Sequence, residues 1–292
     1  MKHILIVQIL LISIIYCTYP IAIFHGIGDG CDWKNTTLLT NLLKKDLKTH
    51  VECIEIGNGF WTSILENFEN QAKIGCENLK KNPHFQNKFH ILGISQGTLL
   101  GRYIIEKCDI KGEVVNYLSF DGPQQGIGQL PKLYCGKFCD FLNFLTVDLI
   151  YNDFIVKHMA PSSYYKFRWN QKLYNNKNLF LKDLNNEGEI KNEEYKKRML
   201  KLNKIMLIKG KRDTVITPRE SSWFEFYDKE GKEIVKLEDS DFYQKDFIGL
   251  KKLNEDGKII FVEFENEHVL FTLEEYDIYI KNFFLDDGDI NY

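Results

Sequence analysis

The motif G-x-S-x-G at residues 93–97 places one serine, Ser95, between two glycines. It follows an apolar run at 88–92, which predicts a buried strand, and it precedes residues 98–106, which predict a helix. A serine at such a strand-to-helix turn is typical of a nucleophile elbow, because the small flanking residues let neighbouring backbone pass close to it. We therefore expect Ser95 to act as a nucleophile; the alternative is a structural Gly-Ser turn.

A serine nucleophile needs a base that takes its proton and a carboxylate that orients the base. His268, in the loop after the last predicted strand, is the predicted base, and His25 is its rival. Asp213 is the predicted acid, because it follows a strand at the edge where open α/β sheets gather functional groups; Asp121 is its rival, since it also ends a strand. The order Ser95, Asp213, His268 is the order that α/β-hydrolases use.

A glycine-rich turn at residues 25–30, His-Gly-Ile-Gly-Asp-Gly, follows the first predicted strand at 20–24. Such a turn leaves backbone N–H groups free to face a ligand, and in a serine hydrolase it supplies half of the oxyanion hole. The other half is the N–H of the residue after the nucleophile. We assign these donors to the backbone of Ile27 and Gln96. The G-x-G-x-x-G spacing of dinucleotide-binding loops is absent.

Strands alternate with helices along most of the chain, which predicts a mostly parallel central sheet flanked by helices, the α/β-hydrolase fold. The predicted strands are 20–24, 51–56, 88–92, 114–120, 204–209 and 258–262, and the predicted helices are 34–48, 63–81, 98–106 and 274–284. The alternation stops at residues 122–202, which we interpret as an inserted, mostly helical cap over the active site.

The predicted cap contains the most apolar non-strand region of the chain, at residues 138–154. Packing of the cap onto the core accounts for many of these side chains. A further hypothesis is that a subset, including Phe141, Leu145 and Ile150, lines an apolar groove for a long acyl chain.

Residues 4–16 form an almost unbroken apolar run behind Lys2. The run is shorter than the roughly 20 residues that span a bilayer, so it predicts a secretory signal peptide at 1–18, with an uncleaved signal anchor as the alternative. Residues 19–292 are then a single domain. No second apolar stretch approaches membrane-spanning length, so we expect a mature chain without a transmembrane span.

Six of the seven cysteines follow the predicted signal peptide, and an even number in an oxidising compartment predicts disulfide bonds. They are Cys31, Cys53, Cys76, Cys108, Cys135 and Cys139. The spacing lacks C-x-x-C and gives no metal site. Adjacent helices could bring Cys76 and Cys108 together.

Asn35 belongs to the only N-x-S/T sequon and is a predicted glycosylation site.

A formal net charge of −3, from 38 basic and 41 acidic residues, gives no electrostatic footprint for nucleic acid. We therefore expect no nucleic-acid partner.

From residue 20 onward the chain resembles the palmitoyl-protein thioesterases of the lysosomal type. Beyond the elbow and the turn at 25–29, the most specific motifs are Gln-Gln-Gly at 124–126, followed by Leu-Pro at 130–131, and Trp-Phe-x-Phe-Tyr at 223–227. The segment Leu-Lys-Lys-Leu at 250–253 adds to them. These motifs separate the chain from generic lipases.

The resemblance implies Ser95 as nucleophile, Asp213 as acid and His268 as base, with the oxyanion hole at the backbone of Ile27 and Gln96. It also implies the disulfides Cys76–Cys108 and Cys135–Cys139. Two departures stand out. Cys31 is followed by Asp32 rather than by a second cysteine, so Cys31 either pairs with Cys53 or both are free. Asp121 stands where the family has a glycine, and it adds a carboxylate that would act on substrate preference or pH optimum.

The activity that the resemblance implies is hydrolysis of thioester-linked palmitate and other long-chain acyl groups from S-acylated cysteines of proteins or peptides. We expect no cofactor, a monomer, and a lysosomal location reached through the secretory pathway, with secretion from the cell as a further destination. The rival activities are those of a lipase, a carboxylesterase or an acyl-CoA thioesterase with the same triad. A catalytically silent lipid-binding or receptor-binding protein is the rival from another class.

Overall fold

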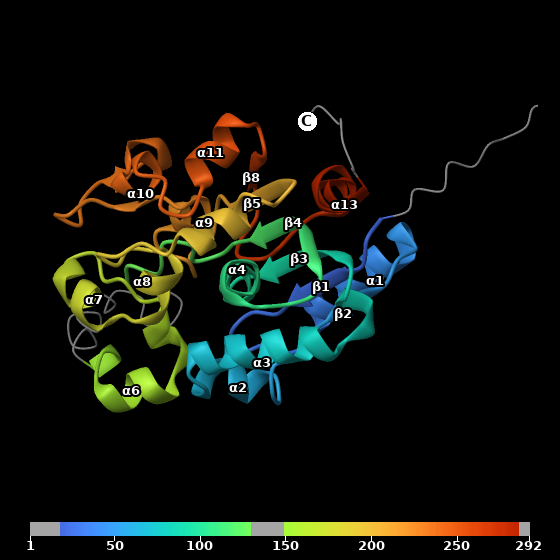
Figure 1. The fold of residues 1–292 in the computed structure, drawn as a ribbon, viewed down its shortest axis with the longest axis horizontal. Helices are drawn as coiled ribbons and strands as arrows, with labels where there is room; N and C mark the ends of the chain where they lie inside the picture. Colours follow the sequence, from blue (N-terminus) through green and yellow to red (C-terminus); the bar gives the residue numbers. More distant parts are fainter. Residues whose placement is uncertain (1–17, 130–148, 286–292) are drawn as a thin grey trace, which may run out of the picture.

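A six-stranded sheet forms the centre of the computed structural model, which describes residues 18–129 and 149–285 (Figure 1). The strand order is β2-β1-β3-β4-β5-β8, and every neighbouring pair is parallel. The strands are β1 (Ile21–Phe24), β2 (Val51–Cys53), β3 (Lys88–Ile94), β4 (Glu113–Phe120), β5 (Lys204–Gly210) and β8 (Ile259–Phe264). The predicted fold class is therefore confirmed, and all six predicted strands are present within the described ranges.

Most strand positions are apolar, and β1 is apolar at all four, because helices cover both faces of the sheet. In β1, Ile21 and Ile23 enter one hydrophobic cluster, whereas Ala22 and Phe24 enter the other. Successive side chains of a strand point to opposite faces, so a strand buried on both sides needs apolar residues at every position.

The helices form two layers (Figure 1). One layer contains α1 (Lys34–Leu47) and the C-terminal run of α12 (Leu273–Glu275), a π-helix (Tyr276–Lys281) and α13 (Asn282–Leu285). The other contains α3 (Phe68–Lys81), α4 (Gly97–Lys107) and α9 (Glu193–Met199).

The predicted helix at 63–81 is in fact two helices, α2 (Phe60–Leu65) and α3. The chain is extended at Glu66 and Asn67, and the Asn67 side chain accepts a hydrogen bond from the backbone of Glu69. Asparagine is a preferred N-cap residue, because its side chain satisfies a free N–H of the first helical turn. Asn67 therefore starts a new helix where the apolar pattern predicts a continuous one.

The helices and strands assigned to the described residues between β4 and β5 are all helices. They include α6 (Asp153–His158), α7 (Gln171–Lys177) and α8 (Phe180–Leu184) as well as α9. Four residues named above, Cys135, Cys139, Phe141 and Leu145, lie outside the described residues, as does residue range 1–17 of the predicted signal peptide. Ile150 is described and packs, partly buried, against the core.

The segment between β5 and β8 contains elements that the sequence analysis does not predict. They are the hairpin of β6 (Phe226–Tyr227) and β7 (Ile234–Val235), followed by α10 (Asp241–Gln244) and α11 (Leu250–Glu255). Across the two described ranges, no helix has both the length and the apolar character needed to cross a membrane.

Two disulfide bonds cross-link the described chain, which confirms the expectation of disulfide bonding. Cys76–Cys108 joins α3 to the end of α4, and Cys31–Cys53 joins the loop after β1 to the end of β2. The loops they close span 32 and 22 residues, a length for which a cross-link stabilises a fold by about 3–4 kcal/mol.

Candidate active site

Ser95 lies in the tight turn between β3 and α4. Its φ of 52° is in the left-handed region, which costs a residue with a side chain about 1–2 kcal/mol. The turn is held by a 2.8 Å hydrogen bond from the Ser95 N–H to the carbonyl of Phe120. Both flanking glycines are required: a Cβ on Gly93 would lie 2.4 Å from the Cα of Thr98, and one on Gly97 would lie 2.2 Å from the Phe24 carbonyl oxygen.

A chain of hydrogen bonds links Ser95 to two other side chains. The Nε2 atom of His268 lies 2.9 Å from the Ser95 hydroxyl oxygen, and its Nδ1 atom lies 2.7 Å from Asp213 Oδ2. Because an ionised carboxylate can only accept, Nδ1 has the hydrogen and Nε2 is free to accept the serine proton. The structure thus brings together the three residues that the sequence selects, in an arrangement that can deprotonate a serine.

Asp213 is fixed on its other side by backbone. Its Oδ1 atom accepts hydrogen bonds from the N–H groups of Val215, at 2.7 Å, and Ile216, at 3.1 Å. Each carboxylate oxygen therefore has a defined partner, which sets the orientation of the imidazole ring.

Burial by itself lowers the pKa of His268, but the hydrogen bond and charge of Asp213, together with the charge of Asp121, outweigh it and raise the pKa above its usual value. A raised pKa makes His268 a stronger base toward the serine hydroxyl. It also means that protonation in acid removes the neutral, proton-accepting form.

Asp121, the rival acid, lies close to the imidazole of His268 but beyond hydrogen-bond distance. Its Oδ2 atom is 3.9 Å from His268 Nδ1 and accepts a 2.6 Å hydrogen bond from the Val269 N–H, while Oδ1 accepts one of 2.6 Å from the Gly210 N–H. The carboxylate is completely buried, and burial raises its pKa to about 6. Asp121 therefore ties the loop after β8 to the end of β5, and the direct bond to His268 belongs to Asp213.

Asp121, Asp213 and His268 have oxygen and nitrogen atoms within 4.8 Å of one another, a grouping compatible with a metal ion. The hydrogen bonds described above already occupy both nitrogens of His268 and all four carboxylate oxygens. The donor set therefore fits acid–base chemistry better than metal binding.

The glycine-rich loop after β1 lies against the serine. A Cβ on Gly26 would lie 3.2 Å from Ser95 Cβ, closer than an ordinary van der Waals contact, so a side chain there would crowd the Ser95 side chain. The backbone of Ile27, one predicted oxyanion donor, follows directly. Ile27 and Gln96 remain predicted donors on these grounds.

Ser63 on α2 connects both predicted donor segments, and the sequence analysis does not single it out. Its hydroxyl accepts a 2.8 Å hydrogen bond from the Gly28 N–H, and its carbonyl accepts one of 3.0 Å from the side-chain amide of Gln96. The Gln96 side-chain oxygen in turn accepts from the Tyr164 hydroxyl at 2.8 Å. These residues are 33 or more positions apart in the sequence, and no local pattern reveals that they meet.

Asn35, the predicted glycosylation site, is exposed in the first turn of α1. Its exposure is compatible with modification, which stays a prediction.

Solved structures share this architecture. A monoacylglycerol lipase from Paleococcus ferrophilus has a TM-score of 0.51 at 16% identity, over 92% of this chain and 96% of the lipase. The parallel sheet, the strained serine turn after β3 and this similarity show that the chain has the α/β-hydrolase fold.

The family follows from sequence comparison. A profile described as palmitoyl protein thioesterase matches residues 20–268. Palmitoyl-protein thioesterase 3 of Dictyostelium discoideum is 31% identical over 284 residues, which cover 94% of both chains. A lysosomal thioesterase PPT2 homologue of Drosophila melanogaster is 29% identical, over 89% of this chain and 88% of the relative. The chain belongs to the palmitoyl protein thioesterase family, and the resemblance seen in the sequence is confirmed.

Proposed function

We propose that this protein hydrolyses thioester-linked palmitate and other long-chain acyl groups from S-acylated cysteines of proteins or peptides. The observation that supports this most directly is the hydrogen-bonded series Ser95–His268–Asp213 in a chain that belongs to the palmitoyl protein thioesterase family.

In the first half of the reaction His268 Nε2 takes the proton of Ser95 as the serine oxygen attacks the thioester carbonyl carbon. The carbonyl oxygen becomes an oxyanion, which the backbone N–H groups of Ile27 and Gln96 stabilise. Collapse of this intermediate breaks the carbon–sulfur bond, and the imidazolium of His268 returns its proton to the leaving thiolate. The products are a free cysteine thiol and an acyl-serine.

The second half repeats these steps with water. His268 removes a proton from water, the resulting hydroxide attacks the acyl-serine, and His268 gives the proton back to the Ser95 oxygen. The fatty acid leaves and the free serine is restored. Asp213 stays ionised throughout and stabilises the imidazolium that forms twice per turnover.

The cellular setting belongs to the same proposal. One relative is named a lysosomal thioesterase, and the predicted signal peptide and the two disulfide bonds fit the secretory route to such a compartment. We place the protein there as a monomer in which residues 122–202 cap the site and apolar cap side chains, Ile150 among them, receive the acyl chain.

The test is the rate of palmitate release from an S-palmitoylated peptide and from its oxygen-ester analogue, for wild type and Ser95→Ala. We expect wild type to prefer the thioester and the variant to be inactive. Equal or faster cleavage of the oxygen ester would favour a lipase or carboxylesterase. Faster cleavage of palmitoyl-CoA than of the peptide would favour an acyl-CoA thioesterase.

A further inference from the structure

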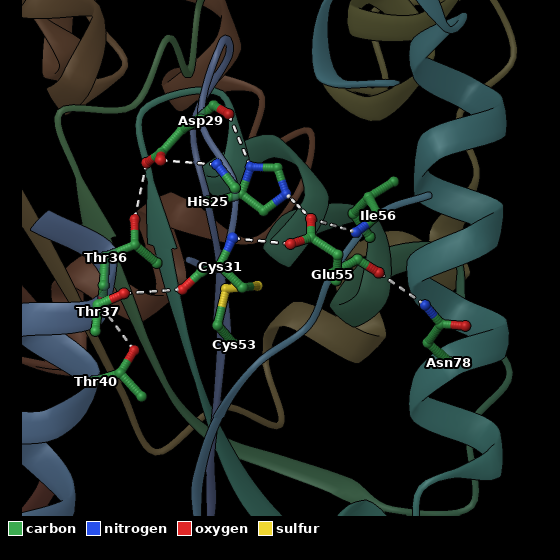
Figure 2. The surroundings of a disulfide bond; sticks show 12 residues. His25, Asp29, Cys31, Thr36, Thr37, Thr40, Cys53, Glu55, Ile56 and Asn78 are labelled. Carbon is green, nitrogen blue, oxygen red and sulfur yellow. Dashed lines mark hydrogen bonds and ion pairs between the residues drawn. A yellow bond between two sulfur atoms is a disulfide. The ribbon is translucent and has the colours of Figure 1, made fainter. Parts of the chain in front are cut away.

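A second histidine near Ser95, His25, follows β1, which lies on the other side of β3 from the strands that precede Asp213 and His268. His25 is 1% exposed and immediately precedes Gly26, the residue that lies against Ser95. Its Nδ1 atom is 3.0 Å from the Gly26 carbonyl oxygen, and its Nε2 atom is 3.0 Å from Glu55 Oε1 (Figure 2).

Both ring nitrogens of His25 therefore face acceptors, one a carbonyl and the other a carboxylate. A neutral imidazole has one N–H, whereas the imidazolium has two. Only the charged ring can donate to the Gly26 carbonyl and at the same time turn an N–H, rather than a lone pair, toward the Glu55 carboxylate. The contact with Glu55 is an ion pair at 3.0 Å whose geometry falls short of a hydrogen bond. A neutral ring would direct a lone pair at the Gly26 oxygen or at the Glu55 carboxylate.

The surroundings favour the charged ring. Burial lowers the pKa of His25, but the contact with Glu55, the bond to the Gly26 carbonyl and the charges of Glu55 and Asp29 raise it by more, so that the net pKa lies above its usual value. Glu55 comes from the segment after β2 and Asp29 from the loop after β1. The nearby Cys31–Cys53 disulfide does not titrate.

The bond to the Gly26 carbonyl sets the direction of the next N–H. The C=O of Gly26 and the N–H of Ile27 belong to one planar trans peptide group, in which they point in opposite directions. A carbonyl that faces the His25 ring therefore directs the Ile27 N–H away from the ring. Ile27 is the predicted oxyanion donor, and its peptide begins at the residue that touches Ser95.

Glu55 is itself held at the far end of the same loop. Its Oε2 atom accepts a 2.9 Å hydrogen bond from the Cys31 N–H, and Cys31 is bonded to Cys53, two residues before Glu55 (Figure 2). The carboxylate thus contacts the start of the loop through His25 and its end through Cys31. Movement of the loop at either end would disturb the ion pair.

We propose that His25, in its charged form and held by Glu55, is a positioning residue that fixes the Gly26–Ile27 peptide with the Ile27 N–H toward the oxyanion. This inference rests on the proposed function, because it assigns a role in the same reaction. Two groups then limit the pH range of turnover. Turnover falls in acid as His268 gains a proton, and the proposed role of His25 adds a fall in alkali as His25 loses its proton.

The experiment measures kcat and KM against pH for the thioester peptide and the oxygen ester with wild type, Glu55→Gln and His25→Gln. Glu55 is 39% exposed, so its variant should fold. Removing its charge lowers the pKa of His25, so the alkaline limb of Glu55→Gln should move to lower pH while the acid limb stays. His25→Gln should lose the alkaline limb and about 10- to 100-fold in kcat, less than the 10²- to 10³-fold typical of a deleted oxyanion donor, with KM nearly unchanged.

A second histidine–glutamate pair provides the control. His50 Nε2 lies 2.8 Å from Glu52 Oε2. The pair lies at the amino end of the edge strand β2, whereas Ser95 follows the carboxyl end of β3. Glu52→Gln should leave both limbs unchanged.

The outcomes separate the two proposals. No hydrolysis of either substrate by wild type would remove the proposed function. Hydrolysis by wild type with a Glu55→Gln profile that superimposes on it would overturn the role of His25 alone. So would an alkaline limb that persists unchanged in folded His25→Gln.

Discussion

Two histidines lie on either side of Ser95, the proposed nucleophile, and each is paired with a carboxylate. His268 lies 2.7 Å from Asp213 and faces a hydroxyl; His25 lies 3.0 Å from Glu55 and faces a backbone carbonyl. The third partner decides the chemistry. A hydroxyl can give up its proton, so the proposed base His268 must be neutral to take it. His25 faces a carbonyl and a carboxylate, neither of which donates, so its proposed role needs the charged ring.

The two carboxylates also differ in their exposure to water. The Asp213 side chain is fully buried and Glu55 is 39% exposed. A buried carboxylate must stay paired, because leaving its charge unpaired is costly, whereas a half-exposed one is partly solvated by water. Substitutions on the His268 side should therefore cost far more activity than matched substitutions on the His25 side.

The largest effect is expected for Ser95→Ala. Loss of the nucleophile should lower kcat by about 10⁴- to 10⁶-fold, because the remaining groups cannot form the acyl-enzyme. Thioester hydrolysis and labelling by a fluorophosphonate probe measure this, and an unchanged unfolding temperature shows that the fold is intact. Activity of the folded variant within about tenfold of wild type would rule out the serine mechanism.

The matched pair Asp213→Asn and Glu55→Gln tests the comparison directly. Asp213→Asn should lower kcat by about 10⁴-fold, because the amide favours the wrong tautomer of His268. Glu55→Gln should cost about tenfold or less at acidic pH, where His25 still gains a proton. The measurement is kcat of both variants at one acidic pH. A similar loss of kcat in the two variants would contradict the difference between the two histidine–carboxylate pairs.

A third substitution, Asp121→Asn, should change the acid limb. The charge of Asp121 raises the pKa of His268, so its removal lowers that pKa, and the loss of activity in acid moves to lower pH. The amide also places a donor against a backbone N–H, which should cost about 1–3 kcal/mol of stability.

The control for this variant is Asp246→Asn. Asp246 accepts a hydrogen bond from the Lys251 N–H and pairs with Lys196, away from the triad. This variant should lose stability with no change in the pH profile. An acid limb that moves equally in both variants would show that Asp121 acts through stability alone.

The two disulfide bonds give the smallest expected difference in activity. Replacing either pair of cysteines by serine should cost about 2–5 kcal/mol of unfolding free energy. Only removal of Cys31–Cys53 should also lower kcat, by a few-fold, because that bond holds the end of the loop after β1 that carries Ile27, a predicted oxyanion donor. Denaturant unfolding and kcat, measured for both double variants, check this; a fall in kcat of equal size in both would contradict it.

The parts of the site that the sequence predicts are those encoded by neighbouring residues. The glycines around Ser95 and the strand before it are adjacent in the chain, so the elbow is visible as a motif. Asp213 and His268 follow strands, and parallel strands bring their carboxyl ends to one edge of the sheet. The sheet itself follows from apolar runs that alternate with helices.

The remaining parts depend on contacts between distant residues. Asp121 and Asp213 both end neighbouring strands, and only the structure shows that Asp213 reaches His268 while Asp121 binds Val269. The contact of Glu55 with His25 joins residues after two different strands. The break at Asn67 depends on a cap within an otherwise continuous apolar pattern.

One turn of α2 has a mechanical consequence. Ser63 binds the glycine-rich loop through its hydroxyl and the elbow through its carbonyl, while the same hydroxyl donates to the Phe60 carbonyl within the helix. A shift of α2 would therefore act on the glycine-rich loop and on the Gln96 side chain together. Two segments that are far apart in the sequence thus share one anchor, so a substitution at Ser63 would disturb both sides of the predicted oxyanion hole at once.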